Sequence, residues 1–165
     1  MAGMLRIGGF GLLFAFLTFP ALPQNKTADL RSRFVRESNP VQQAKLLPQL
    51  GDAEFQDIDK DVTAGRLPDA LAILEQYRAE AQTCQKSLDA AEIDAEKHSS
   101  GFKQLQISLR ESLRRLDTFL SGMTSDEQVP FLDVRKDLAE MNRHLIRELF
   151  PHGPAANSER SAPEH

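Results

Sequence analysis

The sequence contains one cysteine, one tyrosine and no tryptophan among its 165 residues. A single cysteine excludes an intramolecular disulfide, so the stability of the fold must come from its hydrophobic core. Cys84 lies in helical register with Ala81 and Leu88 on an apolar stripe. This register favours a buried thiol over a bridge to a second chain.

Motifs that carry catalysis are missing as well. The chain has no Gly-x-Ser-x-Gly elbow, no glycine-rich phosphate loop, no His-Glu-x-x-His and no Cys-x-x-Cys. Its formal charge is −4, which becomes −5 for residues 25–165 once Arg6 is left out. Binding to nucleic acid needs a basic face, and an acidic chain does not favour one. We therefore expect a non-enzymatic protein with no cofactor and no nucleic-acid partner.

The first 24 residues have the pattern of a secretory signal peptide. Arg6 precedes a charge-free apolar run over residues 7–19, and Pro20 and Pro23 follow it. The run is shorter than the ~20 residues of a membrane-spanning helix. Cleavage after Ala21 would put Phe19 at a position that prefers a small residue, so an uncleaved leader acting as an anchor stays open. We expect export to the periplasm or beyond, with membrane contact only through this segment.

The remaining chain alternates helical apolar stripes with short breaks, and no segment shows the two-residue period of a strand. Asn39, Asp52 and Thr124 are expected to cap helices, whereas Gly51, Gly65 and Gly122 are expected to end them. We predict helices over residues 27–37, 40–50, 52–64, 68–97, 102–120 and 124–150. The predicted fold is all-α: an antiparallel bundle of three to four long helices over residues 25–152, with short N-terminal helices packed across it. Residues 153–165 are predicted to be a disordered tail.

Three arginines on the fifth predicted helix are the candidate partner-binding residues. Arg110, Arg114 and Arg115 form a basic patch that could bind a phosphate or an acidic partner, which includes a protein partner or a second copy. Glu111 stands three and four residues from Arg114 and Arg115, which favours local ion pairs. The arginines become recognition residues only if they face a groove between helices.

Glu140, His144 and Glu148 are the candidate metal ligands. They are spaced four residues apart and therefore share one helical face, and their side chains are of the types that bind transition metals. The Glu-x-x-His pair of di-iron bundles is missing, and Arg143 and Arg147 are interleaved as on a solvated face. A metal-binding helical protein is therefore kept as an alternative.

Several segments resemble known proteins. Residues 64–71 resemble the turn and helix start of a tetratricopeptide repeat, without a second copy. Residues 123–128 resemble the Leu-Thr-x-x-Gln element of periplasmic stress chaperones of the Spy and CpxP type, although Met123 replaces leucine and Gln128 comes one position late. Residues 33–37, 40–45, 101–103 and 113–117 resemble a group of exported bacterial helical proteins, which implies export and a helical fold but no activity.

The leading hypothesis is an exported binding or structural protein of the cell envelope. A periplasmic chaperone or stress-sensing protein is the second hypothesis.

Overall fold

The structure is a computed structural model that describes residues 26–151. Over these residues it contains five helices and no strand. They are α1 (Lys26–Arg36), α2 (Pro40–Thr63), α3 (Leu67–Ala90), α4 (Ser100–Ser121) and α5 (Ser125–Leu149). The all-α prediction is confirmed. The predicted leader (1–24) and tail (153–165) lie outside the described residues.

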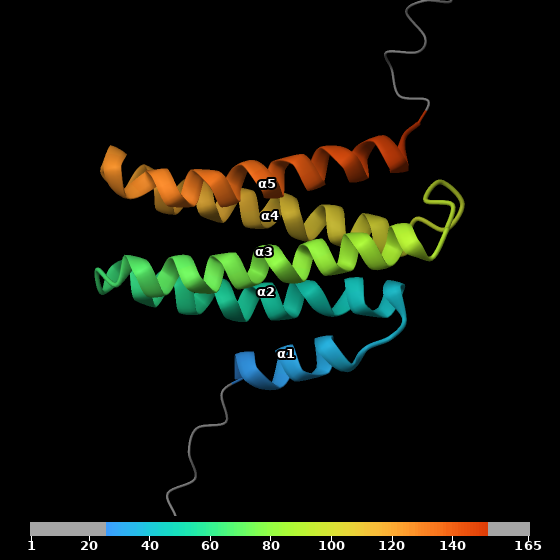
Figure 1. Ribbon diagram of the computed structural model, residues 1–165, viewed down its shortest axis with the longest axis horizontal. Helices are drawn as coiled ribbons and strands as arrows, with labels where there is room; N and C mark the ends of the chain where they lie inside the picture. The colour runs from blue at the N-terminus through green and yellow to red at the C-terminus, as the bar shows by residue number, and fades with distance from the viewer. Residues whose placement is uncertain (1–25, 152–165) are drawn as a thin grey trace, which may run out of the picture.

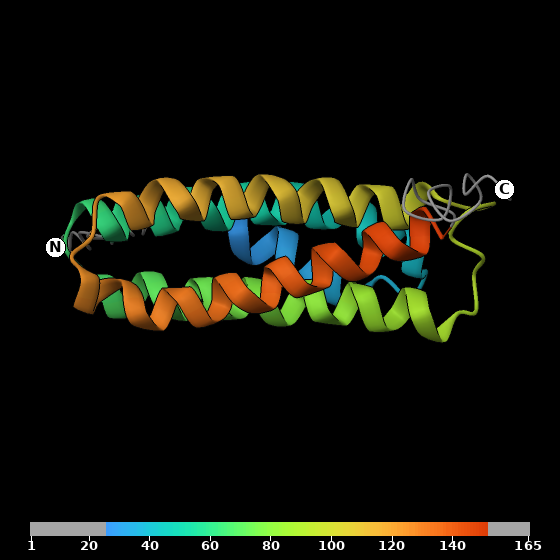
Figure 2. The same ribbon diagram turned by 90° about the horizontal axis from the view of Figure 1, so that it is seen from above.

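The four long helices α2–α5 lie lengthwise beside one another, and α1 lies on the outer side of α2 (Figure 1). Viewed from above, α4 runs over α2 and α5 runs over α3 (Figure 2). α2 packs against α1, α3 and α4, whereas α5 packs against α3 and α4. Within residues 26–151, no helix has the length and apolar character needed to cross a membrane.

α2 is one continuous helix, so the predicted break at Gly51 is wrong. Residues 40–50 and 52–64 were expected to form two helices, but both Pro48 and Gly51 lie inside α2. Gly51 is buried against the ring of Tyr77, and a Cβ at this position would lie 2.8 Å from Tyr77 Cε2. The glycine is required here for a close helix–helix approach, and the packing of α2 on its neighbours outweighs the low helix propensity of glycine.

α3 ends earlier than predicted, at Ala90 instead of near Lys97. Glu92 has φ of +50°, a left-handed conformation that interrupts a right-handed helix. The backbone N–H groups of Glu96 and Lys97 then donate to Asp94 Oδ1, at 3.0 and 3.1 Å. The apolar stripe contains no large side chain after Leu88 on α3, so little burial was available to extend the helix.

Two of the three predicted helix caps, Asn39 and Thr124, are confirmed, whereas Asp52 lies inside α2 and caps no helix. Asn39 Oδ1 accepts hydrogen bonds from the backbone N–H groups of Val41 and Gln42, at 3.0 and 3.1 Å, and Pro40 is the first residue of α2. Glu127 accepts hydrogen bonds from the backbone N–H and the hydroxyl of Thr124, both at 2.8 Å, as part of a capping box. These local side-chain bonds satisfy donors at helix starts and fix where α2 and α5 begin.

The centre of the core is built around Tyr77 of α3, which is fully buried. Its hydroxyl lies 3.2 Å from Ser108 Oγ and accepts a hydrogen bond of 2.7 Å from Ser112 Oγ, both on α4. Its ring meets the ring of Phe55 edge to face, with centroids 5.3 Å apart. Tyr77 therefore ties α3 to both α2 and α4, with its polar end satisfied as burial requires.

We expect Gly51→Ala to destabilise the protein by about 1–3 kcal/mol, because the added methyl group displaces a buried and hydrogen-bonded ring. This loss exceeds the gain of up to ~1 kcal/mol in helix propensity. Urea unfolding followed by circular dichroism measures the difference. Gly122→Ala is the matched control, because its Cβ would meet only Phe119 O at an ordinary 3.6 Å. Equal stability of the two variants would contradict this role for Gly51.

Candidate functional site

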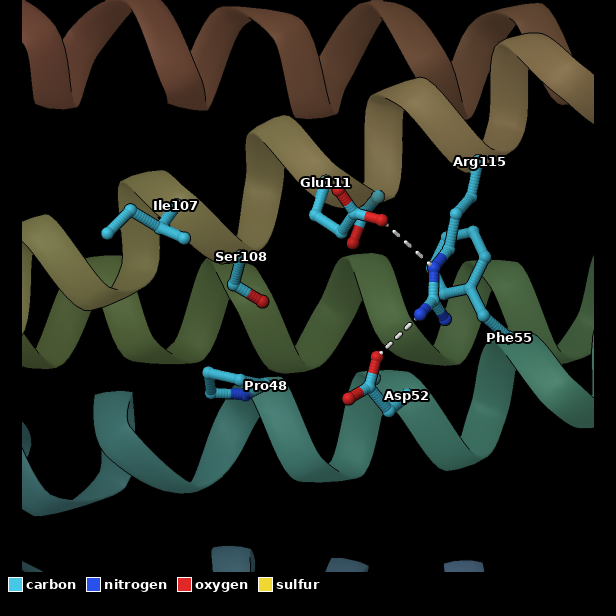
Figure 3. Close-up of a pocket in the computed structure, with 9 residues that line it drawn as sticks. Pro48, Asp52, Phe55, Ile107, Ser108, Glu111 and Arg115 are labelled. Atoms are coloured by element: carbon cyan, nitrogen blue, oxygen red, sulfur yellow. Dashed lines mark hydrogen bonds and ion pairs between the residues drawn. The ribbon is translucent and has the colours of Figure 1, made fainter.

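A pocket of about 130 Å³ opens between α2 and α4 (Figure 3). Gly51, Ser108 and Ser112 line it, and the two serines are the residues that bond the Tyr77 hydroxyl. The rest of its lining is apolar side chains and an ion-pair network, contributed by Pro48, Phe55, Ile107, Asp52, Glu111 and Arg115.

Arg115 crosses the mouth of this pocket from α4 toward α2 (Figure 3). Its Nη2 lies 2.8 Å from Asp52 Oδ1 on α2, and its Nε lies 3.4 Å from Glu111 Oε1 on α4. The guanidinium carbon is 5.7 Å from the centroid of the Phe55 ring, within cation–π range. Two carboxylates and one aromatic ring thus hold a half-buried arginine in place beside an open pocket.

The other two predicted recognition arginines lie elsewhere. Arg114 is exposed and pairs with Glu111, with its Nε 3.1 Å from Glu111 Oε2. Arg110 is exposed and forms no ion pair with the residues that the structure describes. Of the three arginines, Arg115 is the one that lines the pocket between α2 and α4.

The predicted metal ligands on α5 do not gather around one point. His144 Nε2 is buried without a hydrogen bond and lies 3.7 Å from Asp89 Oδ1 on α3. Glu140 lines a shallow depression with Asp89, whereas Glu148 is exposed. Within residues 26–151, no group of three His, Cys, Asp or Glu side chains is placed to hold a metal ion. This arrangement gives the metal alternative no support.

A second cluster of charged residues lies under α1. Glu54 of α2 is completely buried and Glu80 of α3 is 4% exposed. Arg31 of α1 binds both: its Nη2 contacts Glu54 Oε1, and its Nε donates to Glu80 Oε1 at 2.9 Å. Gln76 Nε2 adds a bond of 3.0 Å to the same Glu80 oxygen. The second oxygens of both carboxyl groups are buried without a hydrogen-bond partner.

Burial raises the pKa of Glu54 to about 8, and the neighbouring Glu80 carboxylate adds to the rise. Arg31 opposes this rise in pKa but does not cancel it. The protonated form of Glu54 therefore persists to a higher pH than that of an ordinary glutamate. Perturbed carboxyl groups of this kind mark candidate functional positions, and structural networks produce them as well.

Glu54 and Glu80 were not predicted from the sequence, although a signal for them exists. Glu54 stands four residues after Leu50 and four before Ile58, and Glu80 stands between Tyr77 and Cys84 on the stripe of α3. A carboxylate at a stripe position is expected to be buried. The assumed break at Gly51 separated Leu50 from Glu54, so the continuous stripe was not recognised.

Comparisons with protein-family models, curated proteins and solved structures gave no match. The resemblances noted in the sequence stay predictions. Residues 123–128 form the turn between α4 and α5 and the capping box of α5, and residues 64–71 form the turn and first residues of α3. Both segments thus have a structural role.

We expect the stability of the protein to fall as pH rises from about 4.5 to about 8, because the folded state keeps a proton on Glu54 that the unfolded chain releases. Glu54→Gln imitates the protonated carboxyl, so it should remove this fall and raise the free energy of unfolding at pH 8.5. For each pH unit by which the pKa of Glu54 in the folded protein exceeds its pKa in the unfolded chain, this gain in the free energy of unfolding is at most about 1.4 kcal/mol. Urea unfolding at pH 5 and pH 8.5 measures it. Parallel pH profiles for the two proteins would contradict the buried, protonated state of Glu54.

Proposed function

We propose that this chain is an exported, non-enzymatic binding protein of the cell envelope, and that it recognises a protein partner through the pocket between α2 and α4. The pocket with Arg115 at its mouth is the observation that carries the proposal. Export is supported by the leader pattern of residues 1–24, which would also anchor the chain if it stays uncleaved.

The chemistry of the pocket fits one apolar side chain of a partner. Apolar cavities of about 150 Å³ take up a benzene ring, and this pocket measures about 130 Å³. Pro48, Phe55 and Ile107 supply apolar surface, and Ile107 is 47% exposed at the edge. Asp52, Glu111 and Arg115 add donors and acceptors around it, as in interfaces that combine an apolar anchor with a polar rim.

The arrangement of the long helices supports a pocket of fixed shape. We propose that α2–α5 form an up-and-down antiparallel bundle, because residues 64–66 and 122–124 are connections of only three residues between long helices. The pocket residues then come from two long, neighbouring helices and not from loops. A site built in this way keeps its shape when no partner is present.

Selection of peptides from a random displayed library on the immobilised protein tests the proposal. We expect binders with one large apolar residue beside a polar one. Ile107→Lys and Arg115→Ala should each weaken them tenfold or more, because one substitution puts a charge on the apolar edge and the other removes the guanidinium. Calorimetric titration of a selected peptide measures the affinities.

Arg110→Ala is the matched control, since Arg110 is an exposed arginine of the same helix outside the pocket. Its affinity for the peptide should equal that of the unsubstituted protein. Binders that respond equally to all three substitutions, or to none of them, would show that the pocket is not the recognition site.

The chaperone function is a second proposal, and the exposed apolar side chains favour it. Val129, Leu132, Ile146 and Phe150 are all more than two-fifths exposed along and just after α5. Exposed apolar surface is what an unfolded client would bind. We expect the protein to suppress the aggregation of a reduced, unfolding client, measured by light scattering. No suppression at a several-fold molar excess would rule this function out.

A further inference from the structure

α1 packs on α2, and the side chain of Arg31 also reaches Glu80 of α3. At one end Thr27 Oγ1 donates to Asp57 Oδ2 at 2.8 Å, and at the other Gln43 Nε2 donates to the Phe34 carbonyl at 3.3 Å. Leu30 and Phe34 are its buried apolar side chains. An isolated helix of 11 residues is marginal in water, so α1 depends on these contacts.

The Arg31 cluster is the ionic contact among these, and it is unbalanced in charge. One guanidinium faces two buried carboxyl groups, and each of those keeps one oxygen without a partner. Two ionised carboxylates and one arginine would leave a net negative charge on a pair of buried carboxyl groups, which is costly. The cluster is neutral when the Glu54–Glu80 pair holds one proton.

We propose that α1 is a proton-linked strap: it stays on α2 and α3 while the Glu54–Glu80 pair holds one proton, and it leaves them as that proton is lost. The remainder of the fold does not need α1 to stay together, because α2–α5 pack directly on one another. Residues 37–39 between α1 and α2 are the hinge.

The direction of the effect follows from what α1 covers. With α1 in place, burial and the charge of Glu80 together raise the pKa of Glu54 to about 8, because they outweigh the lowering of this pKa by Arg31. When α1 leaves, the carboxyl groups reach water, and the pKa of Glu54 returns toward its ordinary value near 4.5. The closed state therefore binds more protons than the open one, and closure weakens as pH rises between these values.

The other titratable groups around the cluster do not change charge in this range. Lys60 on α2 lowers the pKa of Asp57, which stays ionised. Burial raises the pKa of both Tyr77 and Cys84 on α3 to about 12, so both stay neutral. On the side of α4, the hydroxyls of Ser108 and Ser112 bond the hydroxyl of Tyr77 and carry no charge. The proton thus belongs to the carboxyl pair.

Native-state amide exchange followed by NMR tests the strap. We expect α1 to open separately from α2–α5, with smaller protection factors and little dependence on denaturant. After correction for base catalysis, the protection factors of α1 should fall by nearly tenfold per pH unit between about 5.5 and 7.5, the slope of one released proton. Glu54→Gln and Glu80→Gln should each remove this slope.

Glu75→Gln is the matched control, because Glu75 is an exposed carboxylate of α3 away from the cluster, and it should leave the slope unchanged. Two results would overturn the strap. The first is that the amides of α1 exchange only when the whole fold opens. The second is that α1 opens separately, but its protection factors do not change with pH or change equally in Glu54→Gln and Glu80→Gln. A helix that merely frays would open separately without the expected pH dependence. The binding function proposed for the Arg115 pocket does not depend on this outcome.

Discussion

The packing of Tyr77 is the constraint on which the rest of the structure depends. A ring this large can lie between α2 and α4 only because Gly51 has no side chain, and its hydroxyl can be buried only because Ser108 and Ser112 bond it. These three small residues also line the pocket beside Arg115. The pocket is thus a consequence of how the core accommodates one tyrosine, since small residues around a large ring leave space at the surface.

α2 connects this pocket with the cluster under α1. Glu54 and Phe55 are adjacent in the chain, yet Glu54 contacts Arg31 of α1 whereas Phe55 lies against Tyr77 and Arg115. Successive residues of a helix point about 100° apart, so one continuous helix serves both sides. A break at Gly51 would instead have separated Pro48 from Asp52 and Phe55, which line the pocket together. The lining of the pocket therefore depends on the continuity of α2.

The sequence was sufficient for features that depend on local chemistry or on periodicity. Helix starts at Asn39 and Thr124 follow from side-chain caps, and the stripes of α4 and α5 follow from large apolar residues at every third or fourth position. The sequence was insufficient where a residue far along the chain decides the local conformation or the contacts of a side chain. Gly51 is helical because Tyr77, 26 positions later, packs on it. Of the three arginines proposed for recognition, Arg115 alone meets an acceptor on another helix.

Stability alone gives no reason for the Glu54–Glu80 pair. Buried charge networks of this kind are often replaced by apolar residues with no loss, or with a gain of about 1–4 kcal/mol. Leu47, Leu50 and Ile58 show that this side of α2 can be filled with aliphatic side chains. Two carboxyl groups at such a position instead provide one acceptor each for Arg31 and make the α1 contact depend on a proton. The apolar contacts of Leu30 and Phe34 do not change with pH, whereas the Arg31 contact fixes the register of α1 and makes the strength of its attachment depend on pH.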